Sequence, residues 1–177
     1  MAKVKQAELV NHVIFAFGRY IDYRLNEVRP ELKEQFGAID YESGTLDFGK
    51  YTFYYNQEMG EGKIEGRILS FAQLIHPAEL PMIKRSTNTL EDQYREGENR
   101  QINLDPGFIH HSQFVLASTK HWGNRLYIGR GVYAEVTLIF VDGTFQPLKY
   151  TYPNYASPEY IEELTKIRKQ YLKKRKS

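Results

Sequence analysis

The sequence predicts an α+β fold: a mostly antiparallel sheet with helices packed against it, and a further helix that closes the chain. Two observations lead to this prediction. Segments with strand and helix periodicity follow one another in the order β-α-β-β-α-β, which is the order of a ferredoxin-like unit, and the second half then alternates short strands with tight turns. With 177 residues and no linker-like segment, we expect a single domain over residues 1–177.

The first two expected elements are a buried strand and a helix. Residues 9–17 are almost continuously apolar and end before a glycine, which predicts a strand buried on both faces. Apolar residues then recur every three or four positions over 21–36, which predicts a helix, and Gly37 stands where a C-terminal cap is expected. Pro30 inside this pattern predicts either a kink or the first turn of a shorter helix.

The middle of the chain is expected to contain two further strands and a second helix. The dipeptide at 43–44 predicts a turn, and the aromatic run over 48–55 predicts the strand that follows it. Residues 59–62 then form a connection to another strand over 63–71. A helix is expected over 77–96, where apolar residues recur along one side.

Turn signals divide the rest of the chain into short strands and a final helix. The tripeptide Asp105-Pro106-Gly107 predicts a tight turn that closes a strand over 100–104. Asp142-Gly143 predicts a two-residue hairpin turn of the primed type. The other elements expected here are a strand or helix over 114–119, a hairpin of 125–128 with 132–141 that turns at 129–131, a strand over 144–150, and a helix over 158–173 capped by Ser157.

Composition excludes several classes of protein. The chain has no cysteine, which excludes disulfides, thiolate metal sites and cysteine catalysis, and fits a reducing compartment. No apolar run approaches the roughly 18 residues that span a bilayer, and the polar start has no signal-peptide core. We therefore expect a cytoplasmic protein with no membrane partner. The net charge of +2 is too small to indicate nucleic acid by itself.

Motifs for nucleotides, serine hydrolysis and metals are missing from the sequence. There is no Gly-x-x-x-x-Gly-Lys-Ser/Thr loop, no Gly-x-Gly-x-x-Gly after the first strand and no Gly-x-Ser-x-Gly elbow. The five histidines show no His-x-x-x-His or Glu-x-x-His spacing, and the adjacent pair His110-His111 would point its rings to opposite faces of a strand. The sequence therefore predicts no local metal site, and it leaves any cofactor unknown.

A polar face is expected where three predicted strands alternate. In 63–68, 125–128 and 132–138, polar residues take one side and apolar residues take the other. If these strands neighbour one another, Ala134, Val136 and Leu138 turn to the core. One face of the sheet would then carry Arg67, Arg125, Tyr127, Tyr133, Glu135 and Thr137. Such a face is either a solvated surface with cross-strand ion pairs or a polar cleft that holds a carboxylate between cations.

Two shorter segments add polar candidates. Asn103 and Asp105 stand at the end of a predicted strand, where they belong either to a tight turn or to a site in which Asp105 is a ligand or base. The triplet Ser118-Thr119-Lys120 sets two small hydroxyls beside a cation, which suits a phosphate oxygen, although such triplets are common.

The first functional hypothesis is a protein or enzyme that handles a small anionic compound, such as a phosphorylated metabolite or a nucleotide. Three cations, Arg67, Lys120 and Arg125, would neutralise the ligand. Glu135 or Asp105, the two catalytic candidates, would act as a general base or a metal ligand. The other residues assigned to the ligand are Asn103, Ser118, Thr119, Tyr127, Tyr133 and Thr137.

The second hypothesis is an RNA- or protein-binding module without catalysis. A sheet face with tyrosines and arginines can stack bases, and the basic run at 173–176 would add affinity for phosphates. The same run also fits a solvated helix end, where cations interact favourably with the helix dipole. The sequence does not give the oligomeric state.

Six segments, taken in order, resemble those of a known family. They are 52–60, 83–91 with Thr87-Asn88, 103–107, 117–120, 125–138 with Tyr127-Ile128-Gly129 and Tyr133-Ala134-Glu135-Val136-Thr137, and 151–155. Together they are similar to the domain of unknown function 4416 (DUF4416) family of bacteria and archaea, over nearly the whole chain. The resemblance implies no characterised activity and falls on the same polar positions as the strand alternation. Members are sometimes labelled GTP-binding, but this chain has neither a P-loop nor an Asn-Lys-x-Asp base-reading motif.

Overall fold

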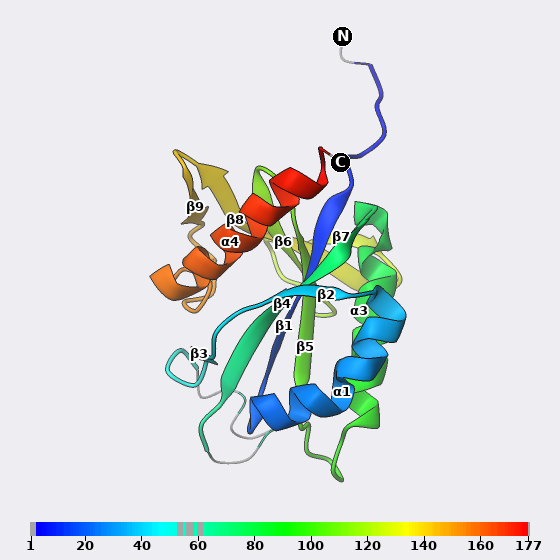
Figure 1. The fold of residues 1–177 in the computed structure, drawn as a ribbon, viewed down its shortest axis with the longest axis vertical. Helices are drawn as coiled ribbons and strands as arrows, with labels where there is room; N and C mark the ends of the chain where they lie inside the picture. Colours follow the sequence, from blue (N-terminus) through cyan, green and yellow to red (C-terminus); the bar gives the residue numbers. More distant parts are fainter. Residues whose placement is uncertain (1–2, 53–54, 56–58, 60–61, 177) are drawn as a thin grey trace.

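The computed structural model describes residues 3–52, 55, 59 and 62–176, and nine strands of this part form one sheet (Figure 1). The strands are β1 (Val10–Gly18), β2 (Ile39–Glu42), β3 (Leu46–Asp47), β4 (Glu65–Ile75), β5 (Asn103–Ile109), β6 (Gln113–Ser118), β7 (Leu126–Gly129), β8 (Val132–Val141) and β9 (Thr144–Pro147). The helices are α1 (Ile21–Phe36), α3 (Leu80–Gln93), which follows the 3₁₀ turn η1 (Pro77–Glu79), and α4 (Pro158–Lys174).

The sheet is antiparallel at every pairing among the described strands. Its order is β2-β4-β1-β5-β6-β8-β7, with β3 paired to β4 and β9 paired to β8. The strands that α1 joins are separated by β4, and the strands that α3 joins are separated by β1, as in a split β-α-β unit. The predicted α+β class, with its ferredoxin-like start, added hairpins and closing helix, is therefore confirmed.

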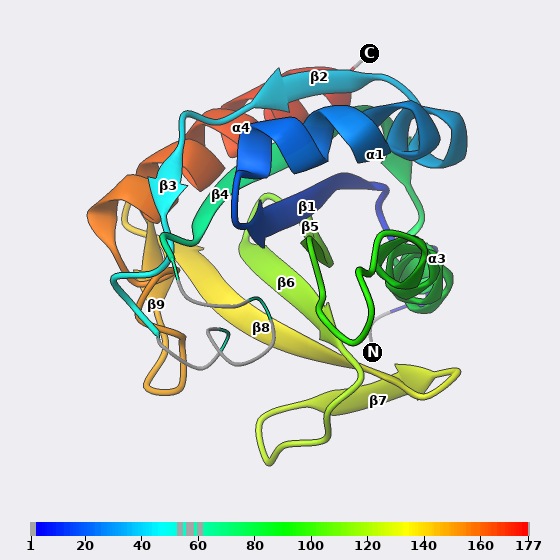
Figure 2. The ribbon, with the colours of Figure 1, turned by 90° about the horizontal axis from the view of Figure 1, so that it is seen from below.

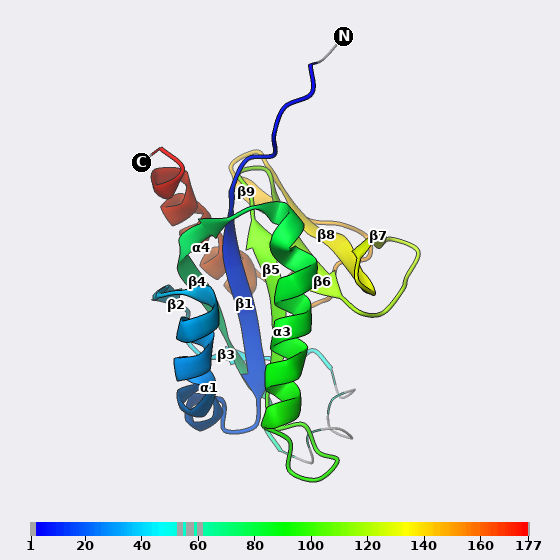
Figure 3. The same ribbon diagram turned by 90° about the vertical axis from the view of Figure 1, so that its right-hand side faces the viewer.

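The helices cover opposite faces of the sheet, because the side chains of β1 alternate between two cores. Ile14 and Ala16 pack with α1, α3 and neighbouring strands in one hydrophobic cluster. Val13, Phe15 and Phe17 point the other way and pack with α4 and the β3 region. Figure 3 shows α1 and α3 in front of the sheet, with β1 visible between them, and α4 behind it. Both faces of β1 are buried, as its continuous apolar sequence predicts.

The sheet separates between β5 and β6, and this separation positions the site described below. The two strands pair only where Gly107, Phe108 and Ile109 meet residues 114–116, so their remaining ends are free to diverge. Figure 2 shows β8 curving away from β1 on the far side of β6. Helix α3 packs on β5 and also contacts β6 and β8, so it lies along the gap.

The predicted turn at Asp105-Pro106-Gly107 is wrong, because these residues lie inside β5. Pro106 precedes the first residue of β5 that pairs with β6, where its missing amide hydrogen breaks no bond to that strand. A Cβ on Gly107 would lie only 2.3 Å from the carbonyl oxygen of Val115. The glycine therefore permits two strands to approach closely, which is a tertiary requirement and not a turn signal.

Two other expectations in the first half of the chain change. The aromatic run 48–55 begins with a turn after β3 and not with a strand, and residues 53–54 of it lie outside the described residues, as does part of the connection at 59–62. Two short strands that were not predicted, β2 and β3, lie on either side of the turn predicted at 43–44. Helix α1 continues through Pro30 and does not restart there, with four buried apolar residues holding it against the sheet.

The hairpins and the last helix agree with the sequence. Asp142 and Gly143 both adopt positive φ, of 51° and 83°, as a type I′ turn between β8 and β9 requires. The segment 114–119 forms a strand, β6, and not a helix. Ser157 is the N-cap residue of α4, but its hydroxyl donates to the carbonyl of Asn154 and not to the helix. No helix in the described ranges combines the length and apolarity that crossing a bilayer requires.

Candidate functional site

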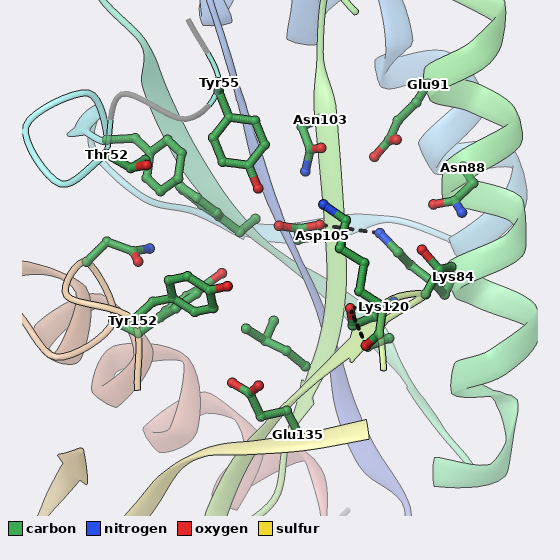
Figure 4. Close-up of a pocket in the computed structure, with 18 of the residues that line it drawn as sticks. Thr52, Tyr55, Lys84, Asn88, Glu91, Asn103, Asp105, Lys120, Glu135 and Tyr152 are labelled. Carbon is green, nitrogen blue, oxygen red and sulfur yellow. Dashed lines mark hydrogen bonds and ion pairs between the residues drawn. The ribbon is translucent and has the colours of Figure 1, made fainter. Parts of the chain in front are cut away.

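A cavity of about 660 Å³ lies where β5 and β6 diverge, between α3 and the turn region before α4 (Figure 4). Figure 4 shows Lys84, Asn88 and Glu91 of α3 on one side, Tyr55 and Tyr152 on the other. Asp105 of β5 lies between them, and Glu135 of β8 closes the lower end. The volume lies within the range of small-molecule sites, which is roughly 300–1,000 Å³.

Lys84 joins α3 to the strand that forms the floor of the cavity. Its Nζ atom lies 3.3 Å from Asp105 Oδ1 and 3.3 Å from the carbonyl oxygen of Leu104, and the lysine side chain is almost fully buried. A buried ammonium needs such partners, because losing water is costly for a charge. The Lys84–Asp105 pair therefore fixes one cation and one carboxylate side by side on the cavity wall.

Glu91 is an acidic residue of the cavity whose pKa is shifted by its surroundings. Its Oε1 accepts a hydrogen bond of 2.6 Å from the Leu104 amide, and its Oε2 lies 3.4 Å from Nη1 of Arg100. Burial raises the pKa of Glu91 to about 7, although the neighbouring Lys84 and the Leu104 amide act in the opposite direction. The carboxyl group is therefore poised between its protonated and ionised forms at neutral pH.

Arg125 forms the second charged group at the opposite end of the cavity. Its Nε donates to Glu135 Oε2 over 2.9 Å, and the two side chains are only 12% and 5% exposed. Its Nη1 donates to Ser118 Oγ and to the carbonyl oxygen of Lys120, both over 2.9 Å. Arg125 lies just before β7, so these bonds connect the hairpin to the end of β6.

Several buried polar atoms of the cavity residues find no hydrogen-bond partner in the part of the chain that the structure describes. Among them are Nε of Arg100, Nδ2 of Asn103 and the hydroxyl of Tyr155. The two nitrogens can only donate, and the hydroxyl can also donate. Native proteins rarely leave such groups unpaired, since each costs free energy when buried. The donors therefore indicate that the cavity receives a molecule rich in hydrogen-bond acceptors.

Tyrosines form the wall that faces α3. Tyr51, Tyr55, Tyr152 and Tyr155 line this side, and burial raises the pKa of Tyr155 well above its ordinary range, so its hydroxyl stays protonated. Aromatic rings offer a flat apolar surface with a polar edge. The cavity therefore has a charged side, formed by α3, β5 and β6, and an aromatic side.

The structure brings most of the predicted polar residues together. Seven of them line the cavity: Asn103, Asp105, Ser118, Thr119, Lys120, Arg125 and Glu135. Four do not line it: Arg67, Tyr127, Tyr133 and Thr137.

The shared face predicted for Arg67 is wrong, because β4 is separated from β8 by β1, β5 and β6. Arg67 pairs instead with Asp22, over 2.7 Å, and donates to the carbonyl of Ser43. It therefore holds α1 and the β2–β3 connection in place, far along the sheet from the cavity.

A β-bulge changes the alternation predicted for β8. Phe114 pairs with Leu138 but Val115 pairs with Val136, so Thr137 is an extra residue and Leu138 packs in a different core from Val136. The Thr137 hydroxyl bonds to the carbonyl of Glu135 and does not reach a ligand site. Tyr127 and Tyr133 pack on one another, with ring centroids 5.4 Å apart, outside the cavity lining.

Sequence reasoning missed the contribution of α3. Lys84, Asn88 and Glu91 of α3 line the cavity at helical spacing, and Arg95 continues the pattern just beyond the helix, so a polar stripe was present in the sequence beside the apolar one. Arg100, in the loop that follows, gave no signal of its own. Its role depends on the fold of that loop against β5.

Comparison with known proteins identifies one family. A family model described as a domain of unknown function (DUF4416) matches residues 6–171, which include every cavity residue named above. Searches among curated proteins and among solved structures find no match.

Proposed function

Because the chain belongs to the DUF4416 family of domains of unknown function, we propose from the cavity itself that the protein binds a small anionic metabolite there. The observation that carries this proposal is the presence of buried donors without a partner among the described residues, including those on Arg100, Asn103 and Tyr155. Phosphate and carboxylate groups supply several acceptor oxygens at once, and arginine matches their geometry.

The charges of the lining support an anion over a cation. Five cationic side chains line the cavity, Lys84, Arg95, Arg100, Lys120 and Arg125, against four carboxylates, Glu91, Asp92, Asp105 and Glu135. The balance is +1 when all nine are ionised. It becomes more positive whenever Glu91 is protonated, which its raised pKa of about 7 makes frequent at neutral pH. A ligand carrying negative charge would restore neutrality.

The arrangement favours a ligand with two unlike parts. An anionic group would lie near Arg100 and Asn103, where the unpaired donors are buried. A flat or apolar part would lie against Tyr55 and Tyr152 on the opposite wall. Sugar phosphates, nucleotides and aromatic carboxylates share this division, and their sizes suit a cavity of about 660 Å³.

If the bound compound is also transformed, we propose Glu91 as the proton-transferring group. Glu91, Asp105 and Glu135 each have an ion-pair partner, Arg100, Lys84 and Arg125 respectively, but burial raises the pKa of Glu91. Glu91 exchanges between both protonation states near neutral pH, which is the property of an effective general acid or base. Asp105 and Glu135 would then hold the cations in position.

The alternative function, an RNA- or protein-binding module, has a separate surface in its favour. Trp122 and Tyr127 are largely exposed, and the second is on an edge strand. We rank it second, because a recessed cavity with buried donors suits a small molecule better than a stacked base. A cytoplasmic location stays part of the proposal, on the absence of cysteine from the sequence.

Thermal unfolding of the purified chain against a panel of compounds tests the proposal. The panel contains inorganic phosphate, sugar phosphates, ATP and GTP, aromatic and aliphatic carboxylates, and a short single-stranded RNA. A compound present at 100 times its Kd stabilises the native state by about 2.7 kcal/mol. For a chain of this size we expect the melting temperature to rise by about 5–10 °C.

Asn103→Asp is the decisive variant, because it keeps the shape of the side chain while replacing an unpaired donor with a negative charge. We expect it to abolish the shift caused by the active compound. Asn26→Asp is the matched control, since it makes the same change on the exposed side of α1. A panel without any small-molecule shift would refute the proposal, and a shift with RNA alone would favour the binding module.

A further inference from the structure

A second cluster of chemically active side chains lies at the opposite end of β5 from Asn103. Glu8, just before β1, approaches His110 and His111, which follow the last residue of β5. Nε2 of His110 lies 3.0 Å from Glu8 Oε2, and Nδ1 of His111 lies 3.5 Å from the same oxygen. The two histidine rings have centroids only 4.0 Å apart.

From the sequence, the rings of His110 and His111 were not expected to lie together, because adjacent residues of a strand point to opposite faces. That reasoning does not apply, since β5 ends at Ile109 and residues 110–112 turn toward β6. Outside the strand geometry, both rings can swing toward Glu8. The residues that approach one another are far apart in the sequence, which is why no short spacing revealed them.

We propose that Glu8, His110 and His111 bind a zinc ion, with a water molecule as the fourth ligand. Two imidazoles and one carboxylate form a common set of protein ligands for zinc at sites that keep one position open. Zinc holds such ligand atoms at about 2.0–2.2 Å, so a tetrahedral site places neighbouring ligand atoms about 3.3–3.5 Å apart. The two separations from Glu8, 3.0 and 3.5 Å, lie close to this spacing.

The surroundings orient both histidines for this role. Nδ1 of His110 lies 3.0 Å from Ser112 Oγ, which leaves Nε2 directed at the proposed ion, and a partner on the second nitrogen is typical of metal-bound histidine. Nδ1 of His111 is buried and has no hydrogen-bond partner among the described residues. The carbonyl of His111 accepts a bond of 2.7 Å from Arg168 Nε, which anchors the turn to α4.

Arg175 would compete with a zinc ion for the carboxylate of Glu8. Its Nη2 lies 2.9 Å from Glu8 Oε2, the same oxygen that approaches both histidines. A zinc ion and a guanidinium would repel one another across this oxygen, so binding requires Arg175 to move away. Arg175 follows α4 and already lies near the ring of Tyr171, which offers an alternative position. The end of α4 lies beside the start of β1, as the bond from the Tyr171 hydroxyl to the carbonyl of Leu9 records (Figure 1).

Zinc titration of the whole chain, freed of metal with a chelator, tests the inference. We expect one zinc ion per chain in competition with a chromophoric chelator, and Co²⁺ in its place should give the intense visible absorption of a tetrahedral site. His110→Gln, His111→Gln and Glu8→Gln should each weaken zinc binding at least about tenfold, since each removes one of only three protein ligands. His121→Gln, an exposed histidine elsewhere, should have no effect.

Arg175→Gln distinguishes this site from adventitious binding to surface histidines. It should tighten zinc binding, because it removes the cation that occupies the Glu8 carboxylate. Circular dichroism of each variant checks that the fold is retained. The inference is overturned if the wild-type chain binds no zinc at micromolar concentration, if the His110→Gln/His111→Gln double variant binds as well as the wild type, or if Arg175→Gln weakens binding.

Discussion

Glu91 of α3 accepts a hydrogen bond from the backbone amide of Leu104 in β5, and this bond crosses the point where the sheet opens. It satisfies an amide that lies on the open side of β5, beyond the residues that pair with β6. The carboxyl group is buried as a consequence, and its burial raises its pKa. One contact therefore links the structure of the cavity to its chemistry.

Replacing Glu91 with glutamine should remove a contribution to stability that declines as pH rises. Because the pKa of Glu91 is about 7 in the folded chain and 4.5 in the ordinary carboxyl, the native state binds more protons between these values. The contribution of Glu91 to the free energy of unfolding should fall as pH rises through this window, by about 1.4 kcal/mol per pH unit, and it opposes the contribution of the buried His12. Glu91→Gln removes the contribution, while its amide oxygen can still accept the bond from Leu104.

Urea denaturation at several pH values between 4.5 and 7.5 measures how the free energy of unfolding depends on pH in the wild type and in Glu91→Gln. Glu34→Gln, at an exposed position of α1, is the control and should leave the slope of the wild type unchanged. Equal slopes for Glu91→Gln and the wild type would show that the carboxyl group titrates normally, and the role proposed for it in proton transfer would then fail.

The Arg125–Glu135 pair should behave as a buried salt bridge. Replacing Glu135 with leucine leaves the guanidinium poorly solvated, so it should lower the free energy of unfolding by about 3 kcal/mol. The double variant Arg125→Met/Glu135→Leu should be more stable than Glu135→Leu, because it no longer buries an unpaired charge. Chemical denaturation of the wild type, both single variants and the double variant measures the coupling. Purely additive effects would contradict a direct interaction between the two side chains.

The elements that the sequence predicted well are those specified by neighbouring residues. The helix stripe of α1 and the Asp142-Gly143 turn depend on periodicity and on local backbone preference, and both formed as expected. Pro30 did not interrupt α1, since packing against the sheet outweighs the loss of one helical bond. The α+β class follows from the order of these elements alone.

The parts that could not be predicted depend on which strands meet. Arg125 and Glu135 were expected together, because β7 and β8 form a hairpin with a short turn. Arg67 was grouped with them only on the assumption that β4 lies nearby, and no local pattern gives strand order. Lys84 and Glu91 had to be recognised as buried, which depends on α3 lying along the gap between β5 and β6.

Gly107 is required because β5 and β6 approach one another closely there, although its sequence context indicates a turn. Replacing it should lower the stability of the protein. In Gly107→Ala the new methyl group would lie 2.3 Å from the backbone oxygen of Val115, so β5 and β6 would have to separate. We expect the free energy of unfolding to fall by about 3 kcal/mol, at the upper end of overpacking effects. Gly123→Ala is the control, since no atom lies within 4 Å of its added carbon, and it should leave stability unchanged or raise it by up to about 1 kcal/mol. Similar urea midpoints for the two variants would argue against the close approach.

His12 should make the protein sensitive to mild acid. Its ring is buried, stacks on Phe71 with centroids 4.6 Å apart and meets the edge of Phe36. Burial lowers its pKa to about 3, so the unfolded chain takes up a proton near pH 6.5 that the native state refuses. Stability from this residue is therefore complete above pH 6.5 and falls by about 1.4 kcal/mol per pH unit toward pH 3.

His12→Leu should reduce this loss, because an apolar side chain of similar size has no proton to gain. Urea denaturation between pH 4 and pH 7 compares the slopes of the wild type and the variant. His121→Leu removes an exposed histidine and should retain the slope of the wild type. If His12→Leu retains it as well, the buried ring does not control the response to acid. A slope that becomes less positive with pH in His12→Leu, and not in His121→Leu, would assign this acid sensitivity to the packing of one imidazole against two phenylalanines.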